Sequence, residues 1–334
     1  MNRREFLFLG VAAAAAKVVS AAEVPAASPV PLKQVKDAVR IIDSTSIFDY
    51  PKRESAYKIL QQSIYAMRDF KPFYDHVANS EGRSSREMDE IYNKYPTLWW
   101  YDHAFDKVLR EFKETEVDGE KPCIWYIYNM GVIVKTKTVS FSIDLCHRKA
   151  KEFAQHLDFA LITHNHGDHQ SPSYTNAMIR GGKPVISNFI LLPKYYFKGS
   201  TRTYEFEGVK VHVSEADHNK HLPNAVMCFE IEVGPENPFV VFHSGDSHKH
   251  TQFAPKNKTP DVFMGHCAVG LNLNKAWQST MPAKLMLPLH HQELGHLGGR
   301  WRCVGFHEEP AKYLKSLTEL GAKTAIPAWG DRLV

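Results

Sequence analysis

A seven-residue run in the middle of the chain, residues 163–169, contains three histidines and an aspartate. It follows directly after the apolar stretch 159–162, so the sequence predicts a buried strand that ends in a loop rich in metal-binding groups. Imidazole and carboxylate groups without nearby cysteine suit Zn²⁺, Mn²⁺ or Fe²⁺ and argue against a closed structural zinc site. A histidine-rich surface loop is the alternative, but such loops rarely follow a buried strand so tightly.

The spacing within the run indicates how the side chains divide. In an extended loop His164 and His166 point to the same side of the backbone. Asp168 and His169 lie beyond Gly167, where the chain can turn. One ion cannot easily use all four side chains, so we expect two metal ions to share the loop.

The pattern His-x-His-x-Asp-His after a hydrophobic strand resembles the signature of the metallo-β-lactamase-fold hydrolases. The remaining ligands of that family are a distant histidine, an aspartate after a glycine, and a final histidine. The chain offers His218, Asp246 and His290 in this order, each after a predicted strand. The resemblance covers roughly residues 123–331 and leaves the first third of the chain unmatched.

The resemblance implies an α/β fold, an αββα sandwich, with two divalent metal ions, zinc or manganese, with iron as an alternative. One ion would be held by His164, His166 and His218. The other would be held by Asp168, His169 and His290, with Asp246 bridging the two. For His218 the alternatives are His212 and His221, and for His290 they are His291 and His296.

The activity that the resemblance implies is hydrolysis by a hydroxide that bridges the two ions. Asp168 could also orient this hydroxide, and His266, after the apolar residues 262–264, is the candidate for substrate contact. The ending Leu-Pro-Leu-His290 looks closest to the branch with ascorbate-6-phosphate lactonase and N-acyl-phosphatidylethanolamine phospholipase. Lactones, esters and phosphodiesters are therefore the candidate bonds. An iron-dependent redox enzyme of the same fold and a non-catalytic metal-binding envelope protein remain as alternatives.

Composition and charge limit the partners. The chain has 334 residues, of which 43% are hydrophobic and 23% charged, with a net charge of +4. This is an ordinary globular composition, and no basic tract stands out, so nucleic acid is not expected as a partner. A small-molecule or lipid-like substrate is expected instead, and a homo-oligomer stays open. The five cysteines show no Cys-x-x-Cys spacing, and no disulfide framework follows from them.

The N-terminus resembles a twin-arginine export signal, with Arg3 and Arg4 before an Ala/Val-rich run that is too short for a transmembrane helix. Residues 1–22 are therefore expected to be a signal peptide read by the twin-arginine export machinery, followed by a linker over 23–32. The expected location is the periplasm or cell envelope of a bacterium. An uncleaved N-terminal anchor is the alternative.

Two further parts are expected, a helical extension over 33–115 and a hydrolase domain over 116–334. In the extension the aromatic run Trp99-Trp100-Tyr101 is expected to pack onto the main domain. Asp144, at the end of a predicted strand, resembles the family's supporting aspartate. The periodicity predicts helices over 55–70, 84–93, 148–157 and 308–320, one from Pro172 to the Gly181-Gly182 stop, and strands over 124–136, 139–145, 185–191, 204–206, 209–213, 227–233 and 324–326.

Overall fold

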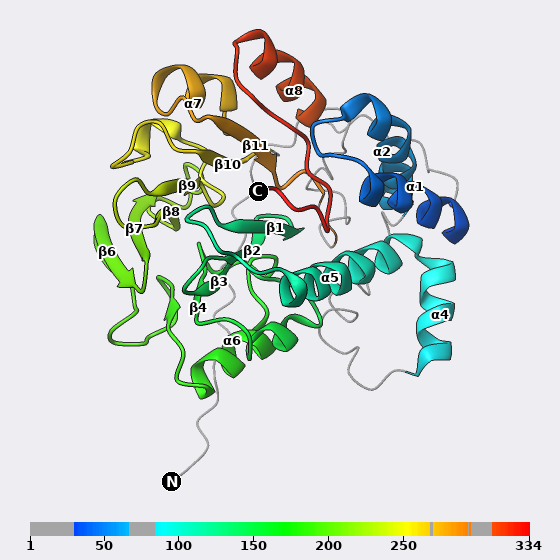
Figure 1. Ribbon diagram of the computed structural model, residues 1–334, viewed down its shortest axis with the longest axis horizontal. Helices are drawn as coiled ribbons and strands as arrows, with labels where there is room; N and C mark the ends of the chain where they lie inside the picture. The colour runs from blue at the N-terminus through cyan, green and yellow to red at the C-terminus, as the bar shows by residue number, and fades with distance from the viewer. Residues whose placement is uncertain (1–29, 67–83, 268–269, 293, 295–308) are drawn as a thin grey trace.

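The computed structural model describes residues 30–66, 84–267, 270–292, 294 and 309–334 (Figure 1). The expected signal peptide, residues 1–22, and most of the expected linker lie outside these residues. Among the helices that are described, none is both long and apolar enough to cross a membrane. Cys123, Cys146, Cys228 and Cys267 are buried, and Cys303 lies outside the described residues.

Two β-sheets form the centre of the molecule. The first has the order β1-β2-β3-β4-β5. Its strands are β1 (Cys123–Tyr128), β2 (Gly131–Lys135), β3 (Ser140–Ile143), β4 (Phe159–Leu161) and β5 (Val185–Ile186). The first three strands are antiparallel to each other, and β3, β4 and β5 are parallel.

The second sheet has the order β11-β10-β9-β8-β7-β6. Its strands are β6 (Thr201–Phe206), β7 (Val209–Ala216), β8 (Val226–Val233), β9 (Phe239–His243), β10 (Val262–His266) and β11 (Leu285–Leu289). Strands β6 to β9 are antiparallel, whereas β9, β10 and β11 are parallel. Parallel strands leave a sheet at one common edge, so several loops can bring polar side chains together there.

The side chains of a strand alternate between its two faces, and this alternation explains how the layers pack. Met264 of β10 belongs to the large core between the sheets, whereas its neighbour Phe263 belongs to a second apolar cluster on the other face. That second cluster includes Leu273 of α7 (Leu273–Ser279) and Leu317 of α8 (Glu309–Glu319), which cover the second sheet. Because successive side chains point to opposite faces, β10 is buried on both sides.

Helices α5 (Pro96–Glu114) and α6 (Pro172–Arg180) cover the first sheet, against β1 and against β4 and β5 respectively. The order helices, sheet, sheet, helices is visible from top to bottom in Figure 1. The αββα sandwich expected from the sequence is confirmed. A short 3₁₀ turn, η2 (His250–Gln252), lies between β9 and β10.

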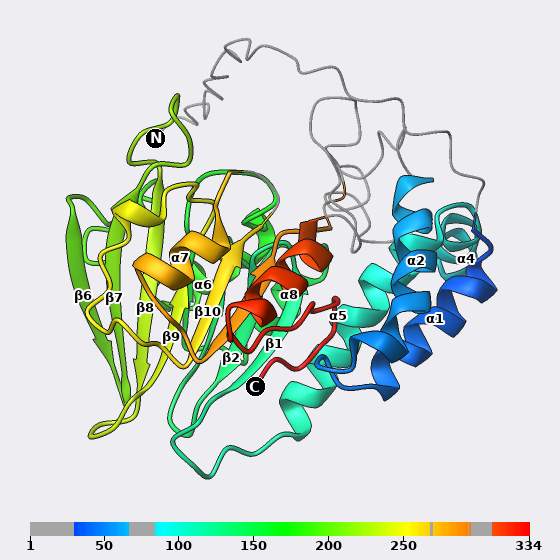
Figure 2. The same ribbon diagram turned by 90° about the horizontal axis from the view of Figure 1, so that it is seen from above.

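The N-terminal helices α1 (Leu32–Ser44), α2 (Tyr50–Tyr65) and α4 (Ser85–Lys94) gather with α5 at the end of the molecule far from β6 (Figures 1 and 2). They are tied to the C-terminal tail, which runs along β1. Arg53 of α2 makes a bidentate ion pair with Asp331 of the tail, at 2.7 and 2.9 Å. Trp100 stacks on Trp329 with ring centroids 4.2 Å apart, so the aromatic run packs as expected.

Several expected elements differ from the sequence pattern. The strand expected over 124–136 is two strands, β1 and β2, separated by a turn, and the strand expected over 139–145 is limited to Ser140–Ile143. The helix expected over 148–157 is a single 3₁₀ turn, η1 (Ala150–Phe153), because the chain must turn back to enter β4 within a few residues. The strand expected over 185–191 ends at Ile186, because the Ser187 hydroxyl accepts the N–H of Ile190 and closes a turn. Residues 324–326 contribute one isolated bridge instead of a strand.

Candidate metal centre

The ligand-rich loop leaves the end of β4 and is fixed there by the end of β3. Asp144 of the β3 end accepts the N–H of Thr163 at 2.7 Å through Oδ1 and the Thr163 hydroxyl at 2.7 Å through Oδ2. Oδ2 also lies 2.8 Å from Nδ1 of His169. Asp144 therefore supports both ends of the loop, as its resemblance to the family's aspartate implies.

All seven residues predicted as ligands lie together. Asp246 is at the centre, because its Oδ2 faces the Nε2 atoms of four histidines at 3.2–3.7 Å; these are His164, His169, His218 and His290. They come from three loops that are far apart in the sequence. All but His166 are buried.

The ligand atoms form two groups, each with all its atoms within 4.8 Å of one another. The first comprises His164, His166, His218 and Asp246, and the second comprises Asp168, His169 and His290. Two ligand atoms bound to one tetrahedral zinc ion at about 2.0–2.2 Å are about 3.3–3.6 Å apart. In the second group Asp168 Oδ2 lies 3.4 Å from His169 Nε2 and 3.2 Å from His290 Nε2. The donor set and its spacing therefore fit a pair of divalent cations.

A glycine aims the central aspartate. Gly245 has φ +51°, and a Cβ there would lie 2.6 Å from Cγ1 of Val226 and 3.0 Å from Thr163. Its N–H donates to Nδ1 of His243, whose Nε2 in turn bonds the carbonyl of Met130 at 2.9 Å. Asp246 thus stands on a turn that only glycine fits and that a buried imidazole supports.

Asn129 is a functional residue that the sequence reasoning missed. Its side-chain amide donates to Asp168 Oδ2 at 3.0 Å, and its carbonyl accepts the N–H of His290 at 3.0 Å. Both Asn129 and His290 have positive φ, 50° and 61°. An Asn-Met-Gly sequence between two apolar runs is the signal that could have identified this turn, because asparagine tolerates the left-handed conformation.

Electrostatics favour the neutral form of several imidazoles at the centre and the charged form of two of its acids. Burial lowers the pKa of His164 and of His266 well below the ordinary value, and it also lowers that of His166. Burial also opposes the charge on His169, but three surrounding carboxylates outweigh it and hold the pKa of that imidazole well above its usual range. Neutral imidazoles and ionised carboxylates are the forms that bind metal ions.

Unsatisfied polar atoms give a second indication that the centre holds cations. Asp246 Oδ1 and His266 Nδ1 are buried and have no hydrogen-bond partner within the described part of the chain. A buried carboxylate oxygen without a donor is costly, so such an atom needs an explanation such as a bound ion. The residues present fit a pair of cations on this ground as well as on geometry.

His266, predicted to contact substrate, lies at the rim of the two groups. Its Nε2 is 3.8 Å from Asp246 Oδ1, and its ring centroid is 4.5 Å from that of His290. Together with these two residues it forms a third set of ligand-capable atoms. His248 stacks on His266 from the other side, with ring centroids 5.7 Å apart.

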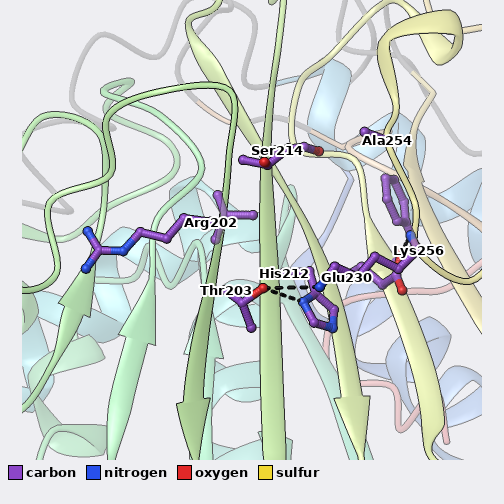
Figure 3. A pocket seen from close by; sticks show the side chains of 10 residues that line it. Arg202, Thr203, His212, Ser214, Glu230, Ala254 and Lys256 are labelled. Atoms are coloured by element: carbon purple, nitrogen blue, oxygen red, sulfur yellow. Dashed lines mark hydrogen bonds between the residues drawn. The ribbon is translucent and has the colours of Figure 1, made fainter.

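Within the described part of the chain, the histidines considered as alternatives to His218 and His290 do not belong to the two groups of ligand atoms. The side chain of His212 is 11% exposed and lines a pocket on the outer face of β6, β7 and β8 (Figure 3). There its Nδ1 bonds the Thr203 hydroxyl at 2.8 Å, and its Nε2 lies 3.3 Å from Glu232. His291 is buried with Nε2 2.8 Å from the Pro327 carbonyl. His221 is exposed, and His296 lies outside the described residues.

Comparison with known proteins gives similarity of fold only. No protein-family model matches the chain, and no curated protein matches it. Igni18, a metallo hydrolase from the archaeon Ignicoccus hospitalis, is 16% identical with a TM-score of 0.48, over 64% of this chain and 97% of its own. An isothiocyanate hydrolase from Delia radicum gut bacteria is 13% identical with a TM-score of 0.45, over 64% and 98%.

CmlA, a diiron β-hydroxylase from Streptomyces venezuelae, is 14% identical with a TM-score of 0.45, over 63% of this chain and 53% of its own. At such identities and TM-scores the chemistry of the centre has to be inferred from its own geometry.

Proposed function

We propose that this protein is a dinuclear metal-dependent hydrolase that cleaves an ester, a lactone or a phosphodiester. The observation that carries the proposal is the convergence of four imidazole Nε2 atoms on Asp246 Oδ2 at 3.2–3.7 Å. One carboxylate oxygen cannot accept hydrogen bonds from four imidazoles at once. A pair of cations bound here would explain why the four nitrogen atoms are turned toward it.

Each residue then has a stated task. His164, His166 and His218 would hold one ion, Asp168, His169 and His290 would hold the other, and Asp246 would lie between them. Zinc or manganese fits these donors, and iron fits them too. When bound, such cations acidify a water molecule to a pKa of about 7 and polarise the substrate oxygen.

Asp168 and His266 are the proposed catalytic residues. Asp168 Oδ2 accepts the Asn129 amide and faces His290, which holds the carboxylate in one orientation. An ionised carboxylate held in this way can accept a hydrogen bond from the attacking water and orient it. His266 is neutral because burial lowers its pKa, so it can donate one hydrogen bond to a substrate oxygen.

Metal content and turnover, measured together, test the proposal. We expect two ions per chain in the purified protein, and hydrolysis of at least one of a model lactone, p-nitrophenyl ester or bis-p-nitrophenyl phosphate. Asp246→Ala should lose ions and turnover together. His212→Ala is the matched control, because it removes an imidazole from the pocket in Figure 3 and should change neither. Turnover that survives Asp246→Ala contradicts the proposal.

The same donor set supports iron-dependent redox chemistry as a second candidate, because imidazole and carboxylate without thiolate also suit iron. Oxygen consumption by the iron-loaded protein, with no hydrolysis of the three substrates, would favour this candidate. Stoichiometric metal with neither activity would favour a non-catalytic metal-binding protein. For either activity, we also propose that the N-terminal segment directs the protein to the periplasm or cell envelope.

A further inference from the structure

The loop between β5 and β6 carries the most exposed large hydrophobic side chain among the described residues. Leu191 is 77% exposed, compared with 44% for Phe48 and 37% for Ile41. Its neighbours are also apolar or aromatic but are half-buried, and most of them pack against the main core; they are Phe189, Ile190, Leu192, Tyr195 and Tyr196. A single exposed leucine is common on protein surfaces, so its meaning depends on the fixed backbone and the charges around it.

The loop is held in this conformation by its own hydrogen bonds. The Ser187 hydroxyl accepts the N–H of Ile190 at 2.9 Å, and the Ser187 carbonyl accepts the N–H of Phe197 at 2.8 Å. The Leu192 carbonyl accepts two further N–H groups, at 2.8 and 2.7 Å. The backbone on both sides of Leu191 is thus fixed, and the exposure of this side chain follows from the conformation of the loop.

The apolar loop lies at the same edge of the sandwich as the metal centre. Strands β4 and β5 are parallel neighbours, so their ends open at one edge, β4 into the ligand-rich loop and β5 into the apolar loop. The side-chain amide of Asn188 donates to the carbonyl of Ala225 at 3.0 Å, in the loop that carries His218. A surface that docks on the apolar loop therefore faces the edge where the ions would sit.

The charged residues within this segment of the chain have one sign, although Glu215 of β7 lies at its end, against Gly199. From residue 169 to residue 204 the sequence has no aspartate or glutamate, but it has five lysines and arginines. Of these, Lys194, Lys198 and Arg202 are exposed and lie within or next to the apolar loop. The Arg202 guanidinium also donates to the carbonyls of Lys194 and Tyr196, at 3.1 and 3.3 Å. An exposed leucine with tyrosines nearby and exposed basic side chains around it complements an anionic lipid surface.

We propose that residues 188–198 dock the protein on an anionic lipid bilayer, with Leu191 inserted and Lys194 and Lys198 over the headgroups. This orientation turns the edge that carries the metal centre toward the membrane. The inference does not depend on which reaction the centre catalyses, because binding to vesicles can be measured without turnover.

Flotation with vesicles tests the proposal on the full chain. We expect the protein to float with vesicles of phosphatidylethanolamine and phosphatidylglycerol more than with vesicles of phosphatidylcholine alone. Leu191→Asp should lower the partition coefficient about tenfold, since it removes the inserted side chain and adds a repelled charge. Phe48→Asp is the matched control, because it changes the next most exposed hydrophobic residue in the same way, and it should have no effect.

A double charge reversal, Lys194→Glu with Lys198→Glu, should weaken binding to the anionic vesicles and remove most of its dependence on salt. Binding that survives Leu191→Asp belongs to another part of the chain and overturns the proposal. So does wild-type protein that fails to float, or self-association that Leu191→Asp abolishes without any vesicle binding. Metal content and hydrolysis of a soluble ester should be the same in wild type and Leu191→Asp, which separates this test from that of the proposed function.

Discussion

The Asp144 carboxylate and the His169 imidazole are joined by a 2.8 Å hydrogen bond between Oδ2 and Nδ1. This bond makes Nδ1 the donor and turns Nε2 toward Asp246, 3.2 Å away. Because Asp144 also accepts two hydrogen bonds from Thr163, one buried carboxylate fixes both the loop and the orientation of its last histidine.

Asp144→Asn should therefore weaken metal binding without removing a ligand. An amide presents one oxygen where the carboxylate presents two, so His169 or Thr163 loses its acceptor. We expect the affinity to fall about 10- to 100-fold, in competition with a chromogenic chelator. Asp158→Asn is the matched control, because Asp158 accepts the N–H of Ser140 at the opposite end of β3. Equal affinities in the two variants would contradict the assignment.

The ion pair of Arg53 and Asp331 should contribute strongly to the free energy of unfolding of the chain. Both side chains are almost fully buried, at 1% and 4% exposure, and they join α2 to the tail beside β1. Arg53→Met leaves the carboxylate buried without its cation, which should lower the free energy of unfolding by about 3–5 kcal/mol in a urea titration. Lys52→Met, which breaks an exposed pair with Asp49, should leave the unfolding midpoint unchanged.

The sequence predicted which residues gather in one place better than it predicted the elements around them, for a physical reason. The ligands are close together in the sequence or stand directly after apolar strands, and local pattern reveals both features. The helix expected over 148–157 and the strand expected over 185–191 are also local patterns, but tertiary constraints shorten them. The chain must enter β4 beside β3, and the Ser187 hydroxyl diverts it after Ile186.

What the sequence could not reveal are pairings between distant segments. No local sequence pattern predicts the ion pair of Asp331, because its partner Arg53 is 278 residues away. The tail gives no strand signal, yet it pairs with β1 through bonds such as Leu333 N–H to the Ile124 carbonyl. Asn129 was missed for the same reason, since its contacts to Asp168 and His290 exist only once the two sheets are stacked.

Acid should destabilise the protein through His147. This imidazole is fully buried and stacks on Phe105 at 4.1 Å, and its Nδ1 accepts the N–H of Lys149. Burial lowers its pKa to about 3. The unfolded chain has a pKa of about 6.5, so it binds the proton first, and stability is lost as the pH falls from about 6.5 toward 3.

By pH 5 this linkage should cost about 2 kcal/mol relative to pH 8. Urea unfolding of wild type and His147→Phe at both pH values, with chelator present, measures the difference. The phenylalanine cannot titrate, so the variant should lose less stability than the wild type by about this amount. Identical losses in the two proteins would mean that His147 is not the group responsible.

Two substitutions of Asn129 should separate its backbone from its amide. The residue has φ 50°, which glycine adopts freely and alanine does not. Asn129→Gly therefore keeps the turn and loses only the donor to Asp168 Oδ2, whereas Asn129→Ala loses the donor and adds about 1 kcal/mol of strain. We expect both variants to bind metal more weakly by a similar factor, while only Asn129→Ala also lowers the unfolding midpoint of the metal-free protein. If Asn129→Gly binds metal as the wild type does, the amide has no part in orienting Asp168, and the turn alone accounts for the position of this residue.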